Sequence, residues 1–199
     1  ISDLPECVET REFATLSREQ AVLYEQVVDK MLGKVDRSDG IQRRGLILSM
    51  LGKLKQICDH PALADSGDDL ANLVRPDGED LSSLCARSGK AQRMMTLLEE
   101  VLAAGERALV FTQYRRMGRL LSAMIEHDLG AESLFLHGGT PVAKRQKMID
   151  GFQAEECNTP VFVLSLKAGG LGLNLTAANH VFHFDRWWNP AVERQATDR

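Results

Sequence analysis

Glycine, hydroxyl and cationic residues follow an apolar segment near the C-terminal end of the sequence. The run 161–164 is followed by Ser165, Lys167 and the cluster 169–172, Gly-Gly-Leu-Gly. Backbone N–H groups of such a turn can converge on an oxyanion, and Ser165 and Lys167 would add a hydroxyl donor and a positive charge. The alternative is a tight turn that simply requires glycine. Leu175 stands where the last glycine of the G-x-G-x-x-G fingerprint would be, so a dinucleotide site is not indicated.

Two adjacent tryptophans precede an Asn-Pro corner, and Gln195 and Arg199 follow it. One tryptophan of the pair Trp187-Trp188 could stack on or wedge against a ligand, and a lid packed on the rest of the fold is the alternative. Gln195 and Arg199 lie four residues apart and would share one face of a helix. A surface ion pair is the alternative reading of that spacing.

The absence of certain sequence motifs argues against several kinds of functional site. The five histidines have no H-E-x-x-H spacing, and the four cysteines include no C-x-x-C pair. These absences argue against a metal site and against a disulfide framework, and they favour a reducing intracellular setting. The sequence also lacks a G-x-x-x-x-G-K-[ST] phosphate loop and an adjacent acidic Mg²⁺ motif. Any nucleotide chemistry would therefore need residues that this sequence does not contain.

Charge is distributed unevenly along the 199 residues. Residues 1–86 carry 10 Lys and Arg against 16 Asp and Glu, whereas residues 87–199 carry 14 against 12. The second part therefore leaves room for a local phosphate-facing patch despite the net charge of −4. No apolar run approaches the roughly 20 residues needed to cross a bilayer, and the N-terminus lacks the order of a signal peptide. The composition predicts a soluble globular protein.

The segments that would position these residues alternate between strand and helix. Short apolar runs typical of buried strands occupy 107–112, 133–137, 161–165 and 180–185, and amphipathic helices are predicted over 117–125 and 141–152. Thr140-Pro141 predicts an N-cap and a first-turn proline for the second helix. This alternation predicts an α/β fold with a parallel sheet and right-handed crossovers. Ligands of such folds bind at the carboxyl ends of the strands.

Two amphipathic helices are predicted before this alternating region. Ser17 and Gln20 form a capping-box pattern for the first, which leads to a polar loop over 33–40. The second ends at His60-Pro61, because the residue before a proline disfavours helix. The acidic stretch 62–86 is predicted to be a long mobile loop and marks the domain boundary. Ser88 is predicted to cap a further helix that ends near Leu102.

Taken together, these motifs resemble the C-terminal RecA-like lobe of SWI/SNF-type ATPases, the double-stranded-DNA translocases of helicase superfamily two. The resemblance covers nearly the whole chain, and several ordered motifs at the family's spacing make it specific. The stretches that carry it are 16–24, 54–61, 88–90, 108–114, 136–140 with Arg145 and Phe152, 165–175, and 185–199. It implies a lead-in segment over 1–86 with two helices and an acidic loop, followed by a helicase C-terminal domain over 87–199.

The resemblance also implies roles for individual residues. Those facing the DNA would be Gln113, Tyr114, Gly138, Gly139, Ser165, Lys167 and Trp188. Gly170, Gly172 and Asn174 would lie toward the nucleotide, and Gln195 and Arg199 would act at the γ-phosphate. Arg199 would be an arginine finger that stabilises charge on the transferred phosphoryl group. ATP and Mg²⁺ would be bound mainly by an N-terminal RecA-like lobe of the same polypeptide, with double-stranded DNA or a nucleoprotein complex as partner.

The sequence departs from the family pattern at a few positions. Leu166 stands where threonine is frequent, and Asp59 stands where asparagine is common. The family's motif six continues past Arg199, so the resemblance predicts a lobe truncated within that motif. Two other functions remain open: a strand-separating helicase of RNA or single-stranded DNA, and a non-catalytic interaction module that uses the acidic loop or the N-terminal helices.

Overall fold

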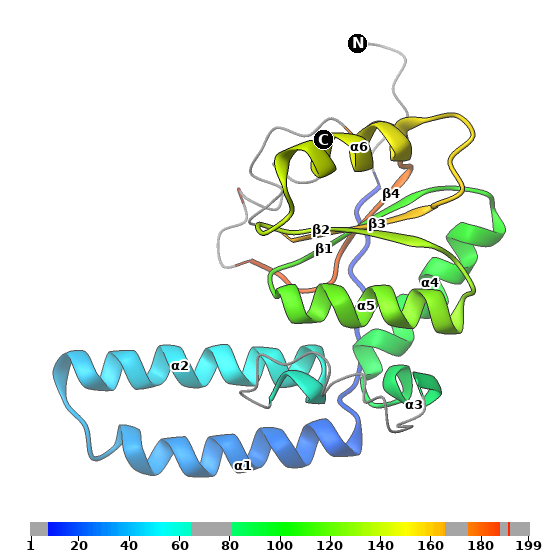
Figure 1. The fold of residues 1–199 in the computed structure, drawn as a ribbon. Coiled ribbons are helices and arrows are strands. Elements are labelled where there is room, and N and C mark those ends of the chain that lie inside the picture. The colour runs from blue at the N-terminus through cyan, green and yellow to red at the C-terminus, as the bar shows by residue number, and fades with distance from the viewer. Residues whose placement is uncertain (1–7, 65–80, 166–174, 188–190, 192–199) are drawn as a thin grey trace.

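The computed structural model describes residues 8–64, 81–165, 175–187 and 191 (Figure 1). Within them, the N-terminal part contains α1 (Arg18–Val35), α2 (Gly40–Asp59), the 3-10 turn η1 (Pro61–Leu63) and the short helix α3 (Leu81–Ala86). The remainder contains α4 (Gly89–Ala103), β1 (Ala108–Thr112), α5 (Arg115–Asp128), β2 (Ser133–Leu136), α6 (Val142–Gln153), β3 (Val161–Ser165) and β4 (His180–His183). None of the described helices is long and apolar enough to cross a membrane.

The four strands form one parallel sheet in the order β2-β3-β1-β4, as the alternation of strand and helix predicted. The central strand β1 pairs with β3 so that Thr112 lies beside Ser165, and it pairs with β4 so that Phe111 lies beside His183. All four carboxyl ends therefore reach the same edge of the sheet. The predicted RecA-like α/β class is confirmed.

Both faces of the sheet are covered by helices, because successive side chains of a strand point to opposite faces (Figure 1). Ala108 and Val110 of β1 pack with the apolar residues of α4 and α5. Leu109 and Phe111 point the other way and pack in a second cluster with Phe152 of α6. β1 is buried at all five positions and β3 likewise, which explains their continuous apolar sequences.

Helices α1 and α2 form an antiparallel pair, which we call the helical hairpin, that projects away from the sheet on the side of its carboxyl ends (Figure 1). Ser17 and Gln20 form the predicted capping box. Gln20 is also 1% exposed, and its Nε2 donates to the carbonyls of Ile57 and Cys58 at 2.7 and 3.1 Å. One side chain therefore caps α1 and fastens it to the end of α2. The connection is shorter than the predicted loop over 33–40, because α1 continues to Val35.

A set of polar residues, three of them fully buried, joins the base of the hairpin to the sheet domain. We call Asp59, His60, Ser88 and Lys90 the junction. The first three are 0% exposed. Ser88 caps α4 as predicted, since its Oγ accepts from Ala91 N–H, and the same hydroxyl donates to the Asp59 carbonyl at 2.8 Å. His60 Nδ1 accepts from Ala62 N–H, and Nε2 donates to the Leu84 carbonyl at 2.9 Å.

Two predictions about local structure were wrong. Residues 62–86 are not all loop, because Pro61–Leu63 form a 3-10 turn and Leu81–Ala86 form α3. Burial accounts for this: Ala62, Leu63 and Leu84 belong to the main core together with residues of α4 and α5. Thr140 does not cap α6 either. Its Oγ1 accepts from the backbone N–H of His137 at 3.1 Å, and Pro141 is the N-cap residue.

Candidate functional site

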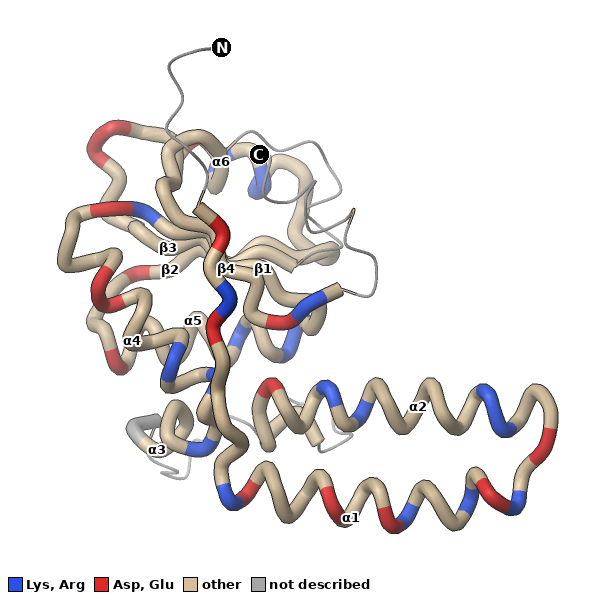
Figure 2. The backbone as a smooth tube through the Cα atoms, turned by 180° about the vertical axis from the view of Figure 1, so that it is seen from behind, with Lys and Arg blue, Asp and Glu red and all other residues tan. Residues whose placement is uncertain are grey.

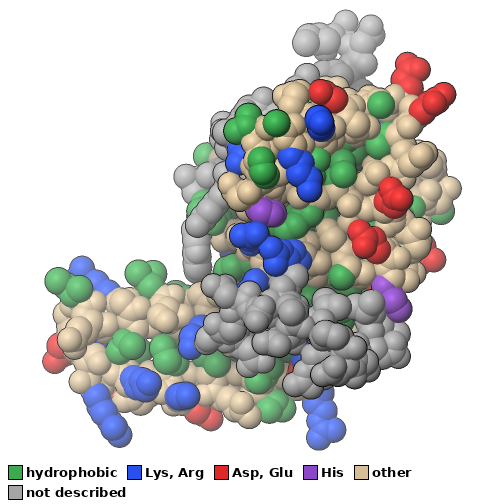
Figure 3. Space-filling view, viewed as in Figure 1, with side chains coloured by type: hydrophobic (Ala, Val, Ile, Leu, Met, Phe, Trp, Pro, Cys, Tyr) green, Lys and Arg blue, Asp and Glu red, His purple; other side chains and the backbone are tan. Residues whose placement is uncertain are grey.

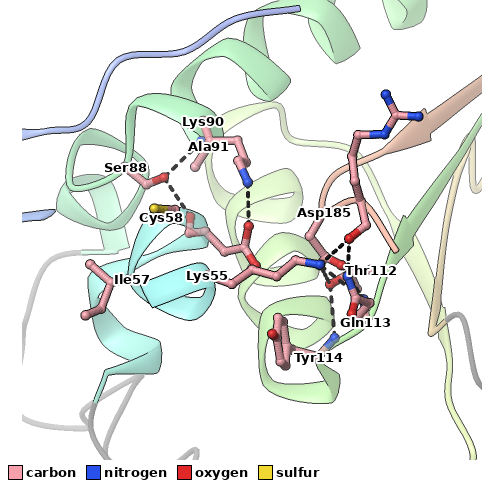
Figure 4. Close-up of polar contacts among 12 residues, drawn as sticks. Lys55, Ile57, Cys58, Ser88, Lys90, Ala91, Thr112, Gln113, Tyr114 and Asp185 are labelled. Carbon is pink, nitrogen blue, oxygen red and sulfur yellow. Dashed lines mark hydrogen bonds and ion pairs between the residues drawn. The ribbon is translucent and has the colours of Figure 1, made fainter. Parts of the chain in front are cut away.

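The turns that follow β1 and β4 are held together by a buried carboxylate, Asp185 (Figure 4). Asp185 is 1% exposed. Thr112 Oγ1 donates to its Oδ2 at 2.5 Å, and Gln113 N–H donates to its two oxygens at 2.9 and 3.1 Å. A buried carboxylate requires such donors, since removal from water without them costs several kcal/mol. Asp185 therefore fixes the edge of the sheet where a ligand of this fold would bind.

An open pocket of about 370 Å³ lies at this edge. We call it the strand-end pocket. It is lined by Gln56, Leu63, Gln113, Tyr114, Arg115, Arg116, His137, Gly138, Gly139 and Ser165. The structure thus brings together the five described residues for which a DNA-facing role was predicted, from three different strand ends. Gln56 of α2 and Leu63 of the 3-10 turn also reach it, so the hairpin contributes one wall.

Gln113 and Tyr114 form the part of the pocket next to Asp185. The side chain of Gln113 donates from Nε2 to the Arg186 carbonyl at 2.6 Å. Its amide is therefore engaged within the protein, which the sequence did not indicate. Burial, with smaller contributions from Asp59 and Asp185, raises the pKa of Tyr114 to about 12. The phenol consequently keeps its proton at neutral pH and can donate a hydrogen bond.

The loop after β2 presents exposed backbone to the pocket. His137 Nδ1 accepts from Gly139 N–H at 3.0 Å, while Arg145 donates to the carbonyls of Gly138 and Thr140 at 3.1 and 2.7 Å. A Cβ at Gly139 would meet the His137 ring at 3.2 Å, whereas a Cβ at Gly138 would meet no atom of the described structure within 4 Å. Packing therefore accounts for glycine at 139 but not at 138, where close approach of a ligand is a reason for it.

Positive side chains surround the same loop. Desolvation lowers the pKa of His137, and the charges of Arg115, Arg119, Arg145 and Lys144 lower it further. His137 is accordingly neutral at pH 7, which agrees with its Nδ1 accepting a hydrogen bond. Figure 3 shows blue side chains gathered beside a histidine on this face of the molecule. The pocket can thus offer positive charge and the N–H groups of exposed Arg115 to phosphate oxygens.

Sequence reasoning did not single out Arg115 and Arg116, which line the pocket. Arg115 is exposed and lines the pocket at the first position of α5. Arg116 also lines it, and its Nη2 donates to the Ala62 carbonyl at 3.1 Å, which ties α5 to the 3-10 turn at the base of the hairpin. The available signal was the pair Arg115-Arg116 directly after the strand end at Gln113-Tyr114.

A family model described as the helicase conserved C-terminal domain matches residues 89–199. The chain belongs to this family. It is 47% identical over 197 residues to YwqA of Bacillus subtilis, described as an ATP-dependent helicase/translocase, with 99% of the chain and 20% of that protein covered. It is 33% identical over 198 residues to the mouse SWI/SNF-related matrix-associated actin-dependent regulator of chromatin subfamily A member 1, with 98% and 18% covered.

Solved structures place this helicase C-terminal domain among SWI2/SNF2 ATPases. The C-terminal domain of the Sulfolobus solfataricus SWI2/SNF2 ATPase superposes with a TM-score of 0.77 at 43% identity, covering 94% of this chain and 75% of that one. The core of that ATPase in complex with double-stranded DNA gives a TM-score of 0.79 at 39% identity, covering 98% and 38%. The chain spans about a fifth of the length of the curated relatives named above.

Seven of the predicted site residues of this SWI2/SNF2 lobe lie outside the described residues: Lys167, Gly170, Gly172, Asn174, Trp188, Gln195 and Arg199. Their predicted roles toward DNA and nucleotide stay predictions. Trp187 is described, and it is partly buried against the second core cluster. This tryptophan therefore packs on the sheet domain, in agreement with the lid alternative for that residue.

Proposed function

We propose that this chain is the second motor lobe of an ATP-dependent double-stranded-DNA translocase. In this proposal the strand-end pocket and Lys167 contact phosphates of the tracked DNA strand, and Trp188 touches that strand or its minor groove. Gly170, Gly172 and Asn174 lie toward ATP, and Gln195 and Arg199 act at its γ-phosphate. ATP and Mg²⁺ are held mainly by a first RecA-like lobe of the same polypeptide, which closes on this lobe around the nucleotide. Residues 1–86 are the lead-in segment and 87–199 the helicase domain.

The observation that carries the proposal is the composition of the strand-end pocket. Gln113, Tyr114, Gly138, Gly139 and Ser165 come from three strand ends and line it together with Arg115 and Arg116. Hydroxyls and arginines bind nucleic-acid phosphates without requiring a particular base, and the exposed backbone at Gly138 leaves room for a phosphate to approach. This supports a lobe that binds the backbone of DNA independently of sequence, as a translocase must.

The division of labour between the lobes gives the first test. The 199-residue chain alone is expected to hydrolyse no ATP, because it has no phosphate loop. The full-length protein is expected to hydrolyse ATP in a DNA-stimulated manner and to displace the third strand of a triplex without unwinding the duplex. Robust hydrolysis by the 199-residue chain alone would refute the division. Strand separation without triplex displacement would indicate a helicase instead.

Arg199→Ala in the full-length protein tests the arginine-finger assignment. We expect kcat for DNA-stimulated hydrolysis to fall by about 10³-fold or more, because the charge on the transferred phosphoryl group loses its partner. Affinity for DNA should be kept within about twofold. Arg18→Ala, which removes an exposed arginine of α1, is the matched control and should leave turnover unchanged. An Arg199→Ala protein that turns over at the wild-type rate would show that Arg199 is not the finger.

A further inference from the structure

The side chain of Lys55, near the end of α2, reaches the corner that follows β4 (Figure 4). Lys55 Nζ donates to the backbone carbonyl of Arg186. The same carbonyl accepts from Gln113 Nε2 at 2.6 Å. One oxygen therefore receives a donor from the hairpin and a donor from the strand-end pocket, and it belongs to the residue directly before Trp187.

The two ends of this connection are both anchored in buried structure. On the α2 side, Leu54 and Ile57 are 7% and 1% exposed, and Asp59 is fully buried. On the other side, buried Asp185 accepts from Thr112 Oγ1 and from Gln113 N–H. Each end of the Lys55–Arg186 bond is anchored in its own part of the fold, so the bond is a direct link between the hairpin and the corner.

We infer that Lys55 is a positioning residue that couples the helical hairpin to the corner at Arg186 and Trp187. A shift of the hairpin would move the Arg186 carbonyl, and with it the donor from Gln113 in the strand-end pocket and the backbone at Trp187. The consequence for turnover rests on the proposed function, whereas the placement of the corner does not. Lys55 acts through Arg186 and contacts no substrate in this scheme.

The sequence provides a direct probe of this corner. Its two tryptophans, Trp187 and Trp188, are adjacent and follow Arg186, so all tryptophan fluorescence of the 199-residue chain comes from them. Lys55→Met keeps the stem of the side chain but removes the donor. We expect it to raise the acrylamide quenching constant by about 1.5-fold or more, because loosening of the corner exposes partly buried Trp187. Lys55→Arg keeps a donor and should restore the wild-type value.

Lys53→Met is the matched control, because Lys53 is an exposed lysine of the same helix that lies outside the contact with Arg186. It should leave quenching unchanged. Circular dichroism on each variant separates local loosening from unfolding. Equal quenching in the Lys55→Met and Lys53→Met chains, both folded, would overturn the inference.

Turnover of the full-length protein gives the second readout. Lys55→Met is expected to lower kcat about tenfold or more while the KM for ATP and the affinity for DNA change less than about twofold, because misplacement by about 1 Å can cost a hundredfold. If the wild-type protein shows no DNA-stimulated hydrolysis, the proposed function fails and the quenching result still decides the positioning role. If the quenching changes as expected and kcat does not, the coupling to turnover is overturned.

Discussion

The junction and the strand-end pocket are neighbouring polar regions that differ in how far their polar residues are exposed to solvent. In the junction, Asp59, His60 and Ser88 are completely buried and bond to other parts of the chain. In the pocket, Arg115, Gly138 and Gly139 are exposed. Buried polar groups that find partners fix one arrangement of a fold, whereas exposed donors remain available to a ligand. The first region therefore joins the hairpin to the sheet domain, and the second is suited to binding.

The same difference is visible in the glycines of the two regions. A Cβ at Gly89, which lies between Ser88 and Lys90 of the junction, would be 2.0 Å from the backbone oxygen of Thr15. Residues 8–16 run past the sheet domain there as an extended segment (Figure 2). A Cβ at Gly138 would meet nothing of the described structure within 4 Å. The protein's own backbone requires glycine at position 89, whereas no atom of the described structure requires it at position 138.

Gly89→Ala is expected to have the largest effect on stability among the changes considered for these regions. The added Cβ must displace the Thr15 backbone, so the free energy of unfolding should fall by about 1–3 kcal/mol. Urea unfolding of the 199-residue chain measures it. Gly52→Ala is the matched control, since a Cβ there meets nothing within 4 Å and alanine favours the helix, which predicts a gain of up to about 1 kcal/mol. Equal stabilities for the two variants would contradict a close approach at Gly89.

Asp59→Asn is expected to change how stability depends on pH. Burial raises the pKa of Asp59 from 3.8 to about 7, an effect that the Lys90 charge reduces and the Asp185 charge increases. Between those two pKa values the folded chain holds a proton that the unfolded chain has lost, so Asp59 makes stability fall as pH rises from about 4 to 7. Asparagine removes this dependence.

We therefore expect the stability of the Asp59→Asn chain relative to wild type to rise by about 2–3 kcal/mol from pH 5 to pH 8. Urea unfolding at several pH values measures the difference. Glu19→Gln is the control: Glu19 hydrogen-bonds to Arg87, which lowers its pKa, so that carboxylate is already ionised at pH 5 and the difference should stay flat. A flat difference for Asp59→Asn as well would show that Asp59 titrates like an exposed carboxylate.

Local sequence signals predicted most of the fold because they act over a few residues. Ser17 with Gln20 and Ser88 define helix starts through hydrogen bonds to their own helix, and both were found where predicted. The continuous apolar runs of β1 and β3 predicted strands buried on both faces. The alternation of strand and helix then restricted the topology to a parallel sheet.

The features that the sequence did not predict depend on distant parts of the chain. Helix α3 lies in an acidic, glycine-bearing stretch, and the burial of Leu84 in the main core is a tertiary contact. The role of Asp185 depends on Thr112 and Gln113, which lie more than seventy residues earlier. Gln113 was expected to face DNA, yet its side chain is bonded to Arg186, a contact that exists only once β1 and β4 are paired.

Arg115→Gln should have the smallest effect on stability, but it should change how the affinity for DNA depends on salt concentration. Arg115 is exposed and lines the pocket, so its loss should change the free energy of unfolding by less than about 0.5 kcal/mol. If it contacts a phosphate, the slope of log affinity against log salt concentration should become shallower by about 0.9, because one fewer counterion is released on binding. Fluorescence anisotropy with a labelled duplex at several salt concentrations measures this slope.

Lys30→Gln separates a contact at the pocket from a general effect of charge. Lys30 is an exposed cation of α1 that does not line the pocket, so its removal lowers the net charge by the same amount. The slope of log affinity against log salt concentration for Lys30→Gln should match that of wild type, because only cations close to phosphates release counterions on binding. Identical slopes for both variants would place the DNA away from Arg115. A shallower slope for Arg115→Gln alone would show that the region left open by the fold, and not the charge of the whole chain, binds the nucleic-acid backbone.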